Sequence, residues 1–181
     1  MNRWMVSLAL ICGLAQPVSA QKFKGDIGLT LQGGLGAAAG SFSYHYGIAP
    51  EFLMQAEYAV KDGTAFGVRG GFRTFAVDEG AATGDVKIAN FTLQGKQLFT
   101  PANRAGLYAV AGWGVYWSKD SKLDDLSNAE WGGFAGLGLH YEASDRVAFI
   151  AETTYNGFFA DPTGIGYFSF NIGATIGLRE E

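Results

Sequence analysis

A strict alternation of apolar residues with small or polar residues runs through most of this chain and limits its fold more than any other feature. Successive side chains of a β-strand point to opposite faces, so a period of two predicts strands, whereas an amphipathic helix has a period near 3.6. The alternation recurs in nine segments: 26–35, 42–48, 52–60, 64–75, 86–99, 106–117, 135–142, 147–156 and 168–178. We therefore predict an all-β fold of antiparallel strands in up-and-down order.

The second face of these strands separates a membrane barrel from a soluble one. It consists mainly of Gly, Ser, Thr, Asn and Gln; the chain has 27 glycines, and only 17% of its residues are charged. A soluble sandwich or barrel turns its apolar face inward and carries charges freely outside. A membrane barrel turns the apolar face to lipid, and its closure satisfies every backbone hydrogen bond there. We expect a transmembrane β-barrel with a narrow lumen, with a soluble exported barrel as the alternative.

The chain length favours eight strands. A spanning strand needs about 9–11 residues, and membrane barrels of single bacterial chains have even strand numbers. We therefore predict that 42–60 is one strand bent at Ala49-Pro50-Glu51, because proline is tolerated at bulges, with a three-residue hairpin as the alternative. This arrangement predicts short periplasmic turns at 61–63, 100–104 and 143–146. It predicts outer loops at 36–40, 76–85, 118–130 and 158–164.

Charged residues on the predicted inner face are balanced, four positive and four negative: Lys24, Asp26, Glu57, Arg69, Arg73, Lys96, Glu142 and Glu152. Buried charges persist only when they are paired. We predict that five of them form a salt-bridged network that fills the lumen: Glu57, Arg69, Arg73, Lys96 and Glu152. For Lys24, Asp26 and Glu142, a position in water at a strand end fits equally well.

Tryptophans mark the expected outer membrane interface. Trp117 and Trp131 bracket 118–130, the most polar stretch of the chain, as an aromatic girdle does in membrane barrels. Trp113 shares the apolar face of Trp117. We expect these three side chains at the interface and regard loop 118–130 as a possible binding surface for a ligand outside the cell.

The N-terminal residues 1–20 have the pattern of a cleaved signal peptide. Arg3 precedes the apolar run 4–14, and Val18-Ser19-Ala20 supplies small residues for cleavage. The apolar run is too short for a spanning helix, which needs about 20 residues. The single cysteine, Cys12, lies in this segment, so we expect the barrel domain, 21–181, to contain no disulfide.

Segments 90–117, 131–158 and 167–178 contain strands with alternating glycines, and the first two add a polar turn and a return strand. They resemble the small outer-membrane β-barrels of Gram-negative bacteria, of the OmpA/OmpX-type and opacity-protein-like superfamily. The resemblance implies a place in the cell outer membrane, with outer-membrane lipid, lipopolysaccharide and the outer-membrane assembly machinery as partners. It also implies a structural or surface role, in envelope integrity or adhesion. A narrow porin-like channel is the alternative, and a lipid A-modifying enzyme is a second one.

Motifs for other chemistry are missing from the sequence. It contains no P-loop, G-x-S-x-G, H-E-x-x-H or EF-hand pattern, and its net charge of −4 argues against nucleic acid as a partner. The histidines are His45, expected on the inner face, and His140. Ser43-Tyr44-His45 reverses the His-x-Ser order of lipid A deacylase barrels. We predict no enzyme activity, no catalytic residue, no cofactor and no metal site.

Overall fold

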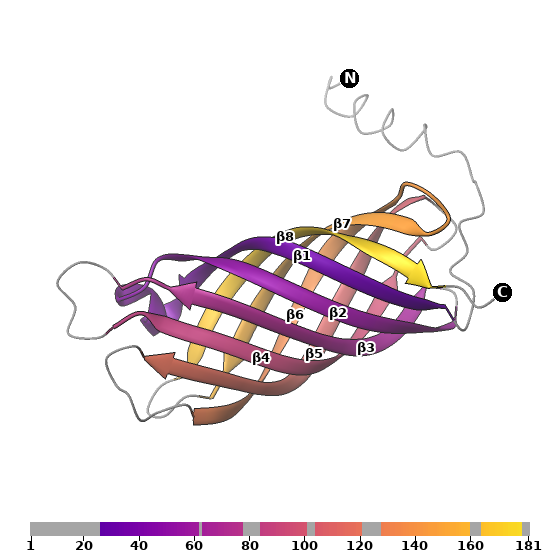
Figure 1. Ribbon diagram of the computed structural model, residues 1–181. Helices are drawn as coiled ribbons and strands as arrows, with labels where there is room; N and C mark the ends of the chain where they lie inside the picture. Colours follow the sequence, from indigo (N-terminus) through magenta and orange to yellow (C-terminus); the bar gives the residue numbers. More distant parts are fainter. Residues whose placement is uncertain are drawn as a thin grey trace, which may run out of the picture.

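The computed structural model describes residues 26–61, 63–77, 84–100, 104–120, 128–159 and 164–178. Within these residues the chain forms a closed barrel of eight strands in sequence order, each antiparallel to its neighbours (Figure 1). The strands are β1 (Ile27–Ala39), β2 (Ile48–Lys61), β3 (Thr64–Phe75), β4 (Val86–Leu98), β5 (Ala105–Asp120), β6 (Asn128–Glu142), β7 (Val147–Phe158) and β8 (Ile165–Leu178). The predicted fold class, an eight-stranded up-and-down barrel, is confirmed.

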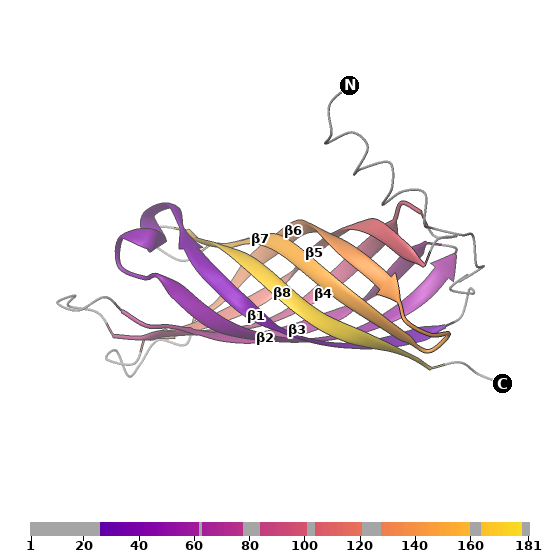
Figure 2. The same cartoon turned by 90° about the horizontal axis from the view of Figure 1, so that it is seen from above.

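The barrel closes by pairing its first strand with its last. The β1–β8 register runs from Ile27 opposite Leu178 to Ala39 opposite Gly166. β1 therefore begins and β8 ends at one end of the barrel, where β2 also meets β3, β4 meets β5 and β6 meets β7 (Figure 2). We call this the terminal end. The opposite end, where β1 leads to β2 and β3 leads to β4, is the loop end.

The strands are longer than a bilayer requires. They range from 12 residues in β3 to 16 in β5, whereas about 9–11 tilted residues span the hydrocarbon. The predicted turn 143–146 is confirmed, and in it the Ser144 hydroxyl accepts a hydrogen bond from the backbone N–H of Val147 at 3.2 Å.

The predicted long strand 42–60 is wrong, although the predicted number of strands is right. Segment 42–48 is not a strand: β1 continues to Ala39, a short 3-10 helix occupies Gly40–Tyr44, and β2 begins at Ile48. Gly40 has a φ of +63°, a left-handed conformation that glycine adopts without steric cost, and the chain turns there. The first outer connection is therefore 40–47 rather than 36–40.

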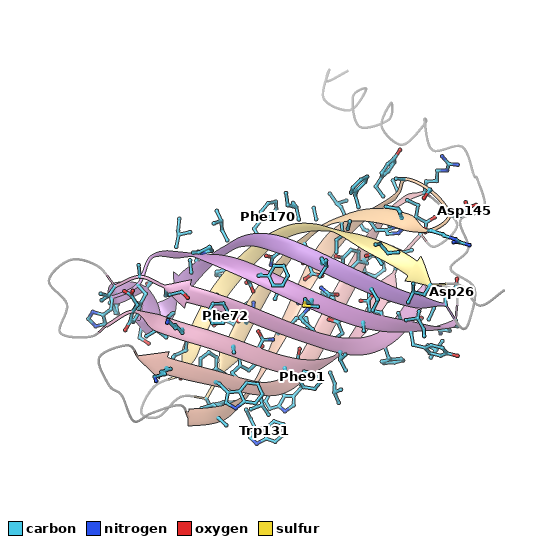
Figure 3. The ribbon with its side chains drawn as sticks, in the orientation of Figure 1. Asp26, Phe72, Phe91, Trp131, Asp145 and Phe170 are labelled. Carbon is cyan, nitrogen blue, oxygen red and sulfur yellow. The ribbon has the colours of Figure 1, made fainter. Side chains whose placement is uncertain are left out.

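The two faces of the wall follow the predicted alternation. Outward side chains such as Leu31, Phe91 and Ile172 are exposed, whereas inward ones such as Thr92 and Asn171 are buried. Figure 3 shows Phe91 and Phe170 projecting away from the barrel. No helix among the described residues is long and apolar enough to cross a membrane.

Candidate functional site

Three ion pairs fill the interior of the barrel. Arg69 on β3 pairs with Glu152 on β7 at 2.5 Å, and Arg73 on β3 pairs with Glu51 on β2 at 2.9 Å. The third pair joins Lys96 on β4 to Glu57 on β2 at 3.2 Å. All six side chains are buried, the two arginines with only 1% of their surface exposed. Each buried charge thus has an opposite charge in contact, the condition under which ions persist away from water.

Each cation of these pairs also lies over an aromatic ring. The Arg69 guanidinium is 4.1 Å from the centroid of the Phe134 ring, and the Arg73 guanidinium is 4.4 Å from that of Tyr167. The Lys96 ammonium is 4.4 Å from the centroid of the Tyr108 ring. These are cation–π distances, and such contacts are strongest where the ions are desolvated. The lumen therefore repeats one unit three times, a carboxylate, a cation and a ring.

Hydrogen bonds connect two of these units and extend the third: Arg73 donates to Asn90, and Asn171 donates to Glu51. The Tyr108 hydroxyl donates to Glu152 Oε2 at 3.0 Å, so the ring that contacts Lys96 also holds the carboxylate that pairs with Arg69. Gln94 donates to Glu57 at 2.8 Å. We call the ion-paired residues and the side chains hydrogen-bonded directly to them the lumen network: Glu51, Glu57, Arg69, Arg73, Asn90, Gln94, Lys96, Tyr108, Glu152 and Asn171.

Glycine makes room for the large side chains of the network. A Cβ atom added to Gly138 on β6 would lie 2.2 Å from the Tyr108 ring on the neighbouring strand, far inside van der Waals contact. The high glycine content therefore has a local cause here, because an inward aromatic ring needs a partner position without a side chain.

Aromatic residues close the barrel at the loop end. Phe42 and Tyr46, from the 40–47 connection, turn inward with ring centroids 4.5 Å apart, and Phe42 lies 5.0 Å from Phe75. Tyr116 stacks on Phe158 at 5.0 Å. We call this group the loop-end cluster, and its buried members are Phe42, Tyr46, Ala49, Phe75, Val86, Ile88, Tyr116, Phe158 and Tyr167. Tyr167 also contacts Arg73, so the cluster adjoins the lumen network.

A pocket lies at the terminal end. Its walls come from β2, β3, β4, β6 and the β2–β3 turn: Ala59, Lys61, Gly63, Thr64, Ala65, Lys96, Leu98 and His140. His140 Nε2 lies 3.4 Å from Glu142 Oε1. No group of three or more potential metal ligands occurs within the described part of the chain.

The structure places all five predicted network residues, Glu57, Arg69, Arg73, Lys96 and Glu152, in the lumen network. Sequence reasoning missed Glu51, which it assigned to a bend. Glu51 lies on β2 at the same parity as Gln55 and Glu57, so extending that alternation backwards would have found it.

The remaining charged or titratable positions had separate outcomes, and Asp26 fits the predicted alternative of a strand-end position. The prediction for His45 is wrong: it is exposed because the 40–47 connection is not a strand. Asp26 lies at the terminal end, as does Asp145 of the β6–β7 turn (Figure 3). Lys24 lies outside the described residues.

The three tryptophans project outward from neighbouring strands. Trp113 and Trp117 on β5 and Trp131 on β6 are between 40% and 59% exposed, and Trp131 lies opposite Val115. They occupy the part of the two strands nearer the loop end. β5 continues to Asp120 and β6 begins at Asn128, so the core of predicted loop 118–130 falls outside the described residues, as does segment 1–20.

Comparison with known proteins gives one family and a set of similar barrels. Residues 6–176 match the profile of a family described as "Outer membrane protein beta-barrel domain". Neisserial surface protein A has a TM-score of 0.66 at 16% identity, with 84% of this chain and 98% of that chain covered. For OprG of Pseudomonas aeruginosa the TM-score is 0.59 at 12% identity, covering 90% and 100%.

Ail, the attachment invasion locus protein of Yersinia pestis, has a TM-score of 0.51 at 17% identity, covering 85% of this chain and 100% of that one. No curated protein sequence matches the chain. At these identities the solved structures show that this chain shares their fold.

Proposed function

This chain belongs to the outer membrane protein beta-barrel domain family, and from that premise we propose that it is a closed, non-conducting barrel with a structural and surface-interaction role. It resides in the cell outer membrane. In our proposal the barrel wall supports envelope integrity, and the loop end faces the outside as an adhesive surface. The terminal end then faces the periplasm.

The observation that carries the proposal is the filled lumen. A pore needs a continuous polar path, but the lumen network joins side chains from β2, β3, β4, β5, β7 and β8 across the interior. The loop-end cluster then closes one mouth with apolar rings. Opening such a lumen would separate three buried ion pairs whose members lie within 3.2 Å of each other, and a buried charge without its partner is strongly unfavourable.

Single-channel recording in planar bilayers tests this proposal. We expect no conductance steps from the wild-type protein. The double variant Arg69→Ala/Glu152→Ala removes both members of one pair and most of their volume, and we expect it to conduct. Arg146→Ala with Asp145→Ala is the matched control, because it removes one cation and one anion from a turn at the terminal end. Steady conductance by the wild type would refute the closed lumen.

A narrow channel is the second candidate, favoured by polar atoms along one side of the lumen. Both amide atoms of Gln32, the side-chain nitrogen of Gln55 and the side-chain oxygen of Asn171 have no hydrogen-bond partner among the described residues. These residues belong to β1, β2 and β8, which are adjacent in the barrel. Buried polar groups of this kind bind water. If the wild type conducts, Gln32→Leu should reduce the current, since it would remove polar groups from this path.

Export and insertion complete the proposal. We infer that 1–20 is removed as a signal peptide and that the outer-membrane assembly machinery inserts the barrel. N-terminal sequencing of protein from the outer-membrane fraction should begin at Gln21. We propose no catalytic activity, so overexpression should leave the mass spectrum of lipid A unchanged; a new lipid A species would favour an enzyme.

A further inference from the structure

Two lysines lie directly opposite each other on the outer wall near the loop end. Lys87 of β4 is the register partner of Lys119 of β5, and both side chains are exposed. Both occupy outward positions of their strands, as Phe91 and Trp117 do. Within the described residues, no carboxylate lies within 4.0 Å of either ammonium. Like charges directly opposite on a sheet are destabilising, so this pair favours an anion between its members.

A hydroxyl extends the cationic pair into a row across three strands. Thr74 of β3 is the register partner of Lys87 on its other side, and its side chain is half-buried. Thr74, Lys87 and Lys119 thus lie side by side on β3, β4 and β5. Two ammonium groups and a hydroxyl are hydrogen-bond donors that suit the several acceptor oxygens of a phosphoryl group.

The adjacent row, toward the middle of the barrel, is apolar. Two residues further along each strand, Phe72 pairs with Ala89, and Ala89 pairs with Trp117. The separation of the rows is about 6.6 Å along the strands, at roughly 3.3 Å per residue. Phe72 and Trp117 are large and outward-facing, and Ala89 between them carries a single methyl group. An acyl chain that lies over Ala89 would contact a ring on either side.

We propose that Thr74, Lys87 and Lys119 bind a phosphoryl group of an outer-leaflet glycolipid, whose acyl chains pack over Ala89 between Phe72 and Trp117. We call these three polar residues and the three of the apolar row the lysine-pair site: Phe72, Thr74, Lys87, Ala89, Trp117 and Lys119. The phosphate level of a leaflet lies just beyond the aromatic belt, which is where the pair lies relative to Trp117. A free anion would use the lysines alone, whereas the apolar row favours a lipid as the source of the phosphate.

The inference rests on the proposed orientation of the barrel, with its loop end outward, and is independent of whether the lumen conducts. It can fail while the lumen proves closed, and it can hold in a barrel that conducts. The terminal end provides a contrast for the test: Arg104 and Arg146 are also exposed there, but they lie at different turns and are not register partners.

Native mass spectrometry of the full-length processed protein in detergent micelles, titrated with purified lipid A, tests the site. The two probes are bisphosphorylated lipid A and the same lipid after removal of its phosphates. We expect the wild type to bind the bisphosphorylated form about 10- to 30-fold more tightly, as two surface lysines would provide. Lys87→Gln/Lys119→Gln should reduce that preference to about twofold or less. Arg104→Gln/Arg146→Gln, with the same loss of charge, should keep it.

Two further measurements separate a lipid site from an anion site. Ala89→Trp should weaken binding of both lipids, because it fills the space over the apolar row, and should keep the preference for phosphate. An excess of inorganic phosphate should not displace the lipid; complete displacement would show an anion site and overturn the proposal.

The proposal is also overturned if the wild type binds both lipids equally or if the lysine variant keeps its preference. Equal losses in the lysine and arginine variants would overturn it as well. Heat-modifiable gel mobility confirms that every variant is folded before titration.

Discussion

The hydroxyl of Tyr108 donates a hydrogen bond to Glu152 Oε2 across 3.0 Å. Because the ring of the same tyrosine lies beneath the Lys96 ammonium, one side chain joins two ion pairs from different strands. Two of the three buried ion pairs are therefore connected, and disturbance of one reaches the other through Tyr108.

Tyr108→Phe should separate these two contacts, because it keeps the ring under Lys96 and removes the donor to Glu152. We expect it to lower the free energy of unfolding by about 1.5–3 kcal/mol, the usual range for a hydrogen bond to a charged group. Urea titration in lipid vesicles measures the change. Tyr44→Phe is the control: Tyr44 is 79% exposed in the 40–47 connection, and its loss of a hydroxyl should have almost no effect. Similar values for both variants would argue against the role of Tyr108.

The Arg69–Glu152 pair should show strong coupling in a double-mutant cycle. Arg69→Met alone leaves a buried carboxylate without its cation, and Glu152→Gln alone leaves a buried guanidinium, so each should cost about 3–5 kcal/mol. The double variant should cost clearly less than the sum of the two, since neither charge remains. Unfolding in vesicles gives the three values. Additive costs would mean that the two side chains act independently despite their contact.

Gly138→Ala should destabilise the barrel because the new methyl group would meet the Tyr108 ring. We expect a cost of about 1–3 kcal/mol, the typical effect of overpacking, or failure to fold. Gly33→Ala is a matched control, since an added Cβ at Gly33 meets no atom within 4 Å. Its effect should stay within about 0.5 kcal/mol. In a Tyr108→Leu background the additional cost of Gly138→Ala should be smaller than in the wild type, and an unchanged cost would locate the clash elsewhere.

Removal of the two rings that come from the 40–47 connection should open the loop end. Ile88 is fully buried in the loop-end cluster, so a thiol in Ile88→Cys should react slowly with a water-soluble maleimide. Adding Phe42→Ala and Tyr46→Ala should raise the labelling rate at least about tenfold, because local opening then costs less free energy. Tyr44→Cys, at an exposed position, should react rapidly in both backgrounds. Equal labelling of Ile88→Cys with and without the rings would show that other residues close the mouth.

The sequence predicted the wall of the barrel well because lipid imposes a simple rule on it. On β8, for example, Phe168, Phe170 and Ile172 all face outward, and the residues between them are small or polar. A period of two with one uniformly apolar face leaves little freedom in the register. The same rule failed at 42–48, where Phe42 and Tyr46 alternate as in a strand but point into the mouth from a turn.

The interior was harder to predict because its contacts are made between strands distant in sequence. The balance of charges indicated paired ions, but no local pattern shows that Arg73 pairs with Glu51 or that Tyr108 links two pairs. The inner face was expected to be small, yet Tyr108 and Tyr116 point inward. The side chains together must fill a lumen whose diameter is set by the number of strands. A large ring on one strand, such as that of Tyr108, is therefore matched by a glycine such as Gly138 on the next strand.

The seam between β1 and β8 has a consequence for how this chain is made. It pairs Ile27 with Leu178. The backbone hydrogen bonds of β1, the first strand to be synthesised, are therefore complete only after β8 has been made. A chain that lacks β8 leaves β1 and β7 as open edges, which hydrocarbon does not tolerate. A shortened product is therefore expected to have no stable state in the bilayer. Closure of the wall thus depends on the fourteen residues of β8, whatever the other strands have already formed.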